Sequence, residues 1–132
     1  MKARTAIRAI ALARAAFGAA LTVRTESLLR MVVKDAEPTG SLFLFARTVG
    51  IRDLVIGLGT LAASFDGESI VDLRRWTRIS LASDAIDTVS GMVSARHVGV
   101  VGSIQATAAS VPFVAGGWWA LRRLPHAEQA ST

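Results

Sequence analysis

The longest uncharged part of this sequence runs from Val98 to Leu121, where no Asp, Glu, Lys or Arg occurs. A helix needs roughly 20 predominantly apolar residues to cross the hydrocarbon core of a bilayer. The segment closes with Trp118-Trp119 and is followed by Arg122-Arg123, an order typical of an aromatic belt with cations reaching the lipid head groups. We therefore predict a transmembrane helix over residues 98–121, with Trp118, Trp119, Arg122 and Arg123 as interface anchors.

Three other segments, at residues 5–23, 42–65 and 73–95, are hydrophobic but interrupted by charges. A central aspartate or arginine costs about 2.5 to 3.5 kcal/mol of insertion, whereas each Leu, Ile, Val or Phe returns about 0.3 to 0.6 kcal/mol. The segment 73–95 carries two aspartates, so it needs neighbouring helices that satisfy them. We expect an all-α integral membrane bundle of about four transmembrane helices. Residues 1–124 would form one domain and residues 125–132 a polar tail.

The first of these segments has alternatives. Arg8 and Arg14 interrupt it, whereas the apolar core of a signal peptide is continuous. An amphipathic helix lying at the membrane interface remains the alternative to a membrane span for residues 5–23.

The distribution of cations predicts the orientation. Four crossings put the N-terminus, the loop after residue 65 and the C-terminus on one side of the membrane. The cations expected on that side are Lys2, Arg4, Arg8, Arg74, Arg75, Arg78, Arg122 and Arg123. Those expected on the other side are Arg24, Arg30, Lys34 and Arg96. The positive-inside rule therefore predicts an inner (cytoplasmic) membrane protein with both termini in the cytoplasm.

Charged residues inside the hydrophobic segments predict a network of ion pairs. In the segment 73–95, Asp84 and Asp87 lie on one helical face with other polar or small residues, so they are expected to face the bundle interior. The predicted intramembrane charge network comprises Arg14, Arg47, Arg52, Asp53, Asp84 and Asp87. Such pairs can fix the register of the helices, or they can form a proton or ion relay.

Small residues predict close helix packing. Gly102, Ala106 and Ser110 recur every four residues, a spacing that lets membrane helices approach closely. The full set of predicted packing residues is Gly50, Gly57, Gly91, Gly99, Gly102, Ala106 and Ser110. Gly50 and Gly57 are plausible complements of the stripe at 102–110. The contact could lie within one molecule or between subunits.

The chain lacks the residues that several classes of function require. The chain has no cysteine, and neither of its histidines, His97 and His126, has a partner at metal-ligand spacing. The arginines do not form a stripe with interleaved aromatics, which disfavours nucleic-acid binding. We expect no cofactor, no metal and no catalytic residue, although Asp84 and Asp87 could in principle perform acid–base chemistry.

One motif resembles a known family. The stretch from Phe45 to Leu58 contains Arg47, Gly50, Arg52-Asp53 and Gly57 in an Arg-x-x-Gly-x-Arg-Asp-x-x-x-Gly pattern. It resembles an uncharacterised family of small, helical membrane proteins, the domain-of-unknown-function family 4267. The later Asp84-Ala-Ile-Asp87 is similar to aspartates on that family's following helix. The resemblance implies a four-helix membrane fold with no assigned activity, and it marks the charged residues and Gly50 as those to test.

The expected function is therefore a non-catalytic accessory or assembly role in the membrane. The partners would be the lipid bilayer and a larger membrane protein complex or a second copy of the chain. The main alternative is a small oligomeric transporter, or an ion- or proton-permeation unit, using Asp84 and Asp87 opposite Arg52. A membrane-embedded enzyme acting on a lipid-like substrate is a third class.

Overall fold

The computed structural model describes residues 3–32, 39–65, 69–93 and 111–124, and within these ranges the regular structure is entirely helical. The helices are α1 (Ala3–Val23), α2 (Thr25–Val32), α3 (Gly40–Ala63) and α4 (Ile70–Val93), followed by a helical segment at residues 111–123. The predicted all-α class is confirmed. Of the helix expected over 98–121, only residues 111–121 fall within the described ranges.

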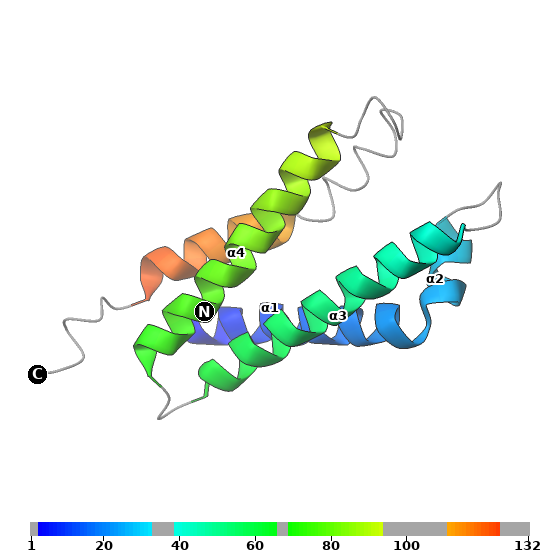
Figure 1. The fold of residues 1–132 in the computed structure, drawn as a ribbon. Helices are drawn as coiled ribbons and strands as arrows, with labels where there is room; N and C mark the ends of the chain where they lie inside the picture. The colour runs from blue at the N-terminus through cyan, green and yellow to red at the C-terminus, as the bar shows by residue number, and fades with distance from the viewer. Residues whose placement is uncertain (1–2, 33–38, 66–68, 94–110, 125–132) are drawn as a thin grey trace, which may run out of the picture.

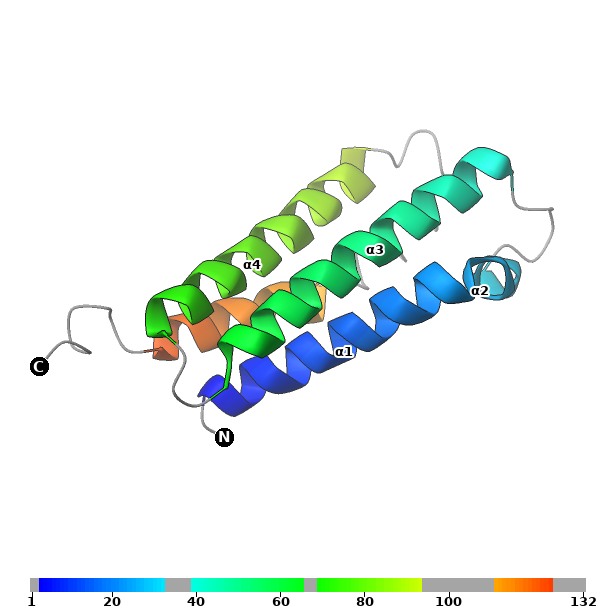
Figure 2. The same ribbon diagram turned by 60° about the horizontal axis from the view of Figure 1, so that its bottom comes forward.

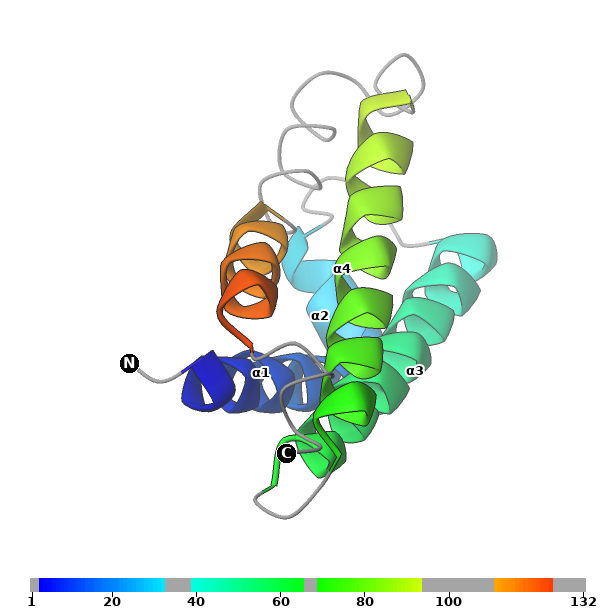
Figure 3. The same cartoon turned by 90° about the vertical axis from the view of Figure 1, so that its left-hand side faces the viewer.

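The long helices form an antiparallel bundle (Figure 1). Contacts pair the start of α1 with the end of α3, where Arg4 donates to the carbonyl of Phe65 at 2.7 Å. At the same end, Arg74 near the start of α4 donates to the carbonyl of Leu124 at 3.0 Å. Figure 2 shows α3 between α1 and α4, and α3 contacts both of them. Figure 3 shows the segment 111–123 beside α4. The start of α1, the end of α3, the start of α4 and the end of the segment 111–123 therefore lie at the same end of the bundle.

A bend at Arg24 separates α1 from α2. Thr25 Oγ donates to the carbonyl of Leu21 at 2.5 Å and to that of Thr22 at 3.3 Å. Thr22, Thr60 and Thr77 make the same contact four residues back inside continuous helices, so this hydrogen bond accompanies the bend and does not by itself end α1. In Figure 2, α2 is seen nearly end-on at the end of α1, so it crosses the direction of the bundle. Its Leu28 and Leu29 pack with residues of α3.

The apolar core is divided between the two ends of the bundle. One cluster gathers Ile7, Ala63, Leu73, Ala120 and Leu124. The other gathers Leu21, Leu29 and Ala46. Along α1, the buried Ile7 and Leu21 belong to these two clusters, and the buried residue midway between them is Arg14. Charged side chains are therefore buried in the middle of the bundle, between the two apolar clusters.

The outer surface is rich in large hydrophobic side chains. Examples on the long helices include Leu12 and Phe17 (α1), Leu44, Phe45, Ile51, Val55 and Leu58 (α3), and Ile86, Val89, Met92 and Val93 (α4). Within the described ranges, α1 has the length and apolar composition to cross a membrane, and it is the one helix there that does.

Candidate functional site: a buried charge cluster

Arg14 lies at the centre of the bundle and joins three helices. Its side chain is 5% exposed. Its Nη2 donates to Asp84 Oδ1 on α4, and its Nη1 donates to Asp53 Oδ1 on α3 at 3.4 Å. The guanidinium carbon also lies 5.6 Å from the ring centre of Phe113, a cation–π contact with the segment 111–123. A single side chain of α1 therefore contacts every other long helical segment.

Arg52 extends this arrangement to the surface. Its Nη1 and Nη2 donate to the two carboxylate oxygens of Asp87, at 2.8 and 2.6 Å, in a bidentate pair. Its Nε and Nη2 also donate to Asp53 Oδ1, at 3.3 and 3.1 Å. The five residues, here called the charge cluster, form one chain of alternating sign in the order Asp84, Arg14, Asp53, Arg52 and Asp87.

Close contact between α1 and α3 positions the cluster. A Cβ atom added at Gly18 would lie 2.3 Å from the backbone nitrogen of Leu54 and 2.6 Å from the carbonyl oxygen of Gly50. One added at Gly57 would lie 2.6 Å from the backbone nitrogen of Ala15. The backbones of α1 and α3 are therefore in contact on the helical turns next to Arg14. This close approach lets the Arg14 guanidinium reach the carboxylate of Asp53 on α3.

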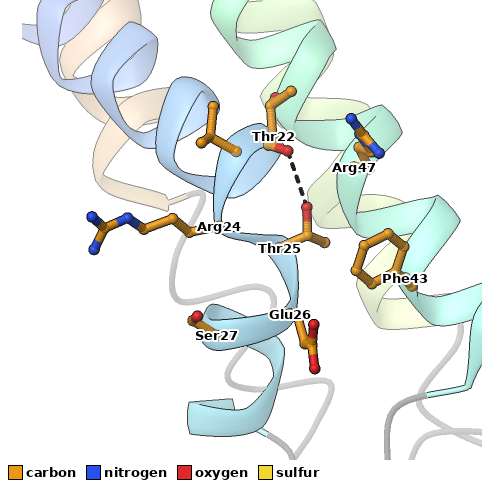
Figure 4. A pocket seen from close by; sticks show the side chains of 8 residues that line it. Thr22, Arg24, Thr25, Glu26, Ser27, Phe43 and Arg47 are labelled. Carbon is orange, nitrogen blue, oxygen red and sulfur yellow. Dashed lines mark hydrogen bonds between the residues drawn. The ribbon is translucent and has the colours of Figure 1, made fainter.

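The structure brings together five of the six residues proposed for the charge network. The sixth, Arg47, is exposed and lies apart from the cluster. It lines an open pocket of about 500 Å³ at the α1–α2 corner, together with Thr22, Thr25 and Phe43. Figure 4 shows Arg47 and Arg24, which both line this pocket, on opposite sides of the α1–α2 corner.

The structure describes three of the seven residues predicted to pack helices closely, Gly50, Gly57 and Gly91. Gly50 and Gly57 are buried, and both pack on α1; the stripe at 102–110 proposed as their complement lies outside the described ranges. Their counterpart, Gly18, was missed, as was Gly59, where an added Cβ would lie 2.5 Å from the Trp76 ring. Gly91 lies near the end of α4. Four predicted packing residues lie outside the described ranges: Gly99, Gly102, Ala106 and Ser110.

The four residues predicted as interface anchors stack in pairs. The Arg122 guanidinium lies 4.6 Å from the Trp118 ring centre, and that of Arg123 lies 4.9 Å from the Trp119 ring centre. All four side chains are exposed. Each pair is separated by one helical turn, so a cation and an aromatic ring share one face at this end of the bundle.

The chemistry that the charge cluster offers is ionic. Its members are carboxylates and guanidinium groups, which bind protons and counter-ions. No group of three or more His, Asp or Glu residues that could hold a metal ion occurs in the described part of the chain.

Comparison with known proteins adds no relative. No family model, curated protein or solved structure matches this chain. The resemblance to the domain-of-unknown-function family 4267 stays a prediction.

Proposed function

We propose that this chain is an integral membrane protein with about four membrane-crossing segments. The proposal rests on the inverted polarity of the protein, in which charged side chains are buried and large apolar side chains are exposed. Arg14 and Asp84 are each 5% exposed, whereas Phe45 is 67% and Ile86 is 65% exposed. Water would favour the opposite distribution, because large contiguous apolar surfaces are rare on soluble monomers. A hydrocarbon solvent accounts for both the apolar exterior and the ion pairs within.

Helix packing supports the same proposal. Membrane helices gain little from burying apolar side chains, since lipid is equally apolar, and they rely on close backbone approach and polar contacts. The α1–α3 interface has both features, in Gly18 and Gly57 and in the Arg14–Asp53 pair.

The proposed orientation places both termini in the cytoplasm. The arginines near the joined helix ends include Arg4, Arg8, Arg74, Arg75, Arg122 and Arg123. Arg24 and Arg30 lie at the opposite end, where Glu26 pairs with Arg30 at 2.9 Å. This bias agrees with the positive-inside rule. Reporter fusions test it: a cytoplasm-active reporter should work at either terminus, and one active only outside the cytoplasm should not.

We propose a non-catalytic accessory or assembly role within the membrane. Both arginines of the charge cluster are engaged by aspartates of the same chain, and these pairs tie α4 to α1 and α3. Since α4 is too polar to insert readily alone, the pairs are suited to holding it in the bundle. With these groups paired to one another, the apolar exterior is the surface available to a partner.

Affinity purification from the native membrane in mild detergent tests this role. Recovery of a stoichiometric complex with a larger membrane protein is the expected result. Arg47 lies outside the charge cluster, so the control variant Arg47→Gln should recover the same complex as the wild type. A homo-oligomer without any partner would contradict the accessory role and favour the second candidate, a small permeation unit. The unequal number of cations and anions in the cluster specifically favours that candidate.

A further inference from the structure

The charge cluster contains more carboxylates than guanidinium groups. Among the residues that the structure describes, Arg14 and Arg52 are joined to three aspartates by ion pairs. With every group ionised, the cluster carries a net charge of 2 − 3 = −1. An uncompensated charge inside a low-dielectric bundle is strongly unfavourable. Building on the proposed membrane function, we propose that the cluster is a binding site for a single proton, held on Asp84 at neutral pH.

The arrangement of oxygen atoms favours a proton over a metal cation. Both oxygens of Asp87 accept hydrogen bonds from Arg52, and Oδ1 of Asp53 accepts from both arginines. A hard metal cation requires several oxygen ligands converging on one point. No such group of side chains occurs in the part of the chain that the structure describes. A proton requires only one oxygen.

Asp84 is the carboxylate least compensated by positive charge. From α1 it faces Arg14, which also serves Asp53. From α3, Arg52 is committed to Asp53 and Asp87. The contact that Arg14 makes with the segment 111–123 is with the uncharged ring of Phe113. Asp53 contacts both guanidinium groups, and Asp87 has a bidentate partner.

Protonation is compatible with the observed contact. Arg14 donates to Oδ1 of Asp84, and this hydrogen bond persists when Oδ2 carries the proton. Because the five groups interact strongly, the proton count is a property of the whole cluster. Release and uptake of this proton would change the cluster's charge while leaving the Arg52–Asp87 pair in place. That is the elementary step a proton-permeation unit requires.

The charge balance gives a stoichiometric test by infrared spectroscopy. The full-length protein in lipid nanodiscs at neutral pH should show the carbonyl band of one protonated carboxyl group. Asp84→Asn should abolish the band, because two cations then balance two anions. Asp84→Glu should move it to the frequency of a protonated glutamic acid. The control Asp72→Asn, at an exposed site in the first turn of α4, should leave one group protonated.

Changing the arginines tests the balance in the opposite direction. Arg52→Gln should raise the count to two protonated groups. If that variant does not fold, Arg52→Gln combined with Asp87→Asn keeps the wild-type net charge of −1, with Arg14 facing Asp53 and Asp84, and should return the count to one. Absence of the band in the wild type, or its persistence in Asp84→Asn, would overturn the proposal. The infrared band reports protonation and does not report membrane insertion. Insertion is measured separately by labelling of single cysteines, so failure of the proton-site proposal can be told apart from failure of the membrane proposal.

Discussion

Replacing Gly18 by alanine should force α1 and α3 apart. The added Cβ would lie 2.3 Å from the backbone nitrogen of Leu54, whereas ordinary contact begins at 3.4 Å, a shortfall of 3.4 − 2.3 = 1.1 Å. The obstructing atoms belong to the backbone, so no rotamer change relieves them. Overpacking costs about 1 to 3 kcal/mol, and the higher helix propensity of alanine returns about 1 kcal/mol. Since the clash is with backbone, we expect a net loss of about 2 kcal/mol.

The same displacement would weaken the charge cluster. The Arg14–Asp53 pair already spans 3.4 Å, and a further separation of this size would break it. The assay is equilibrium unfolding in detergent followed by far-UV circular dichroism. Gly117→Ala is the matched control, because its Cβ would meet only Leu81 Cδ1 at 3.8 Å, an ordinary contact. The control should be neutral or slightly stabilising. A Gly18→Ala variant as stable as the wild type would refute the close-approach reasoning.

Three further substitutions test other contacts by the same unfolding assay. Arg14→Gln should lower the free energy of unfolding by about 3 to 5 kcal/mol, because it leaves buried carboxylates uncompensated. Adding Asp84→Asn should recover much of this loss, and additive losses from the two changes would contradict the pairing. Gly59→Ala should destabilise the protein by displacing the Trp76 ring, and its effect should shrink in a Trp76→Leu background; equal effects in both backgrounds would exclude that contact. Arg8→Gln removes two hydrogen bonds, of 3.0 and 2.7 Å, to a carbonyl at the end of α3 and should cost about 1 kcal/mol; no change would show that water replaces them fully.

The sequence was sufficient to predict the three long helices that the structure describes in full. The polar breaks at residues 34–40 and 66–69 placed their ends within two or three residues, because Pro, Gly and charges mark the ends of helices. Opposite charges near the middle of apolar helices also had to meet. That requirement correctly grouped Arg14 and Arg52 with the aspartates.

Other features depend on three-dimensional contacts. The residue Arg47 precedes Arg52 by five positions, which is about 140° around a helix, so the two could not share a face. This signal was present in the sequence. No Pro or Gly adjoins Arg24, where the chain bends before α2, so the sequence did not mark this break. The partner of Gly50 and Gly57 could not be chosen from spacing alone, because several helices offered small residues.

The most direct test of the membrane proposal is labelling of single cysteines in native membranes. The chain contains no cysteine, so each variant carries one reactive thiol. Val55 and Ile86 lie within the long helices and are 55% and 65% exposed, while Ser41 and Asp72 are exposed near helix ends. N-ethylmaleimide crosses membranes but reacts with the thiolate, which forms in water. We predict rapid labelling of Ser41→Cys and Asp72→Cys, and labelling of Val55→Cys and Ile86→Cys only after denaturation. Equal labelling of all four variants in intact membranes would contradict the proposal that lipid covers the apolar exterior.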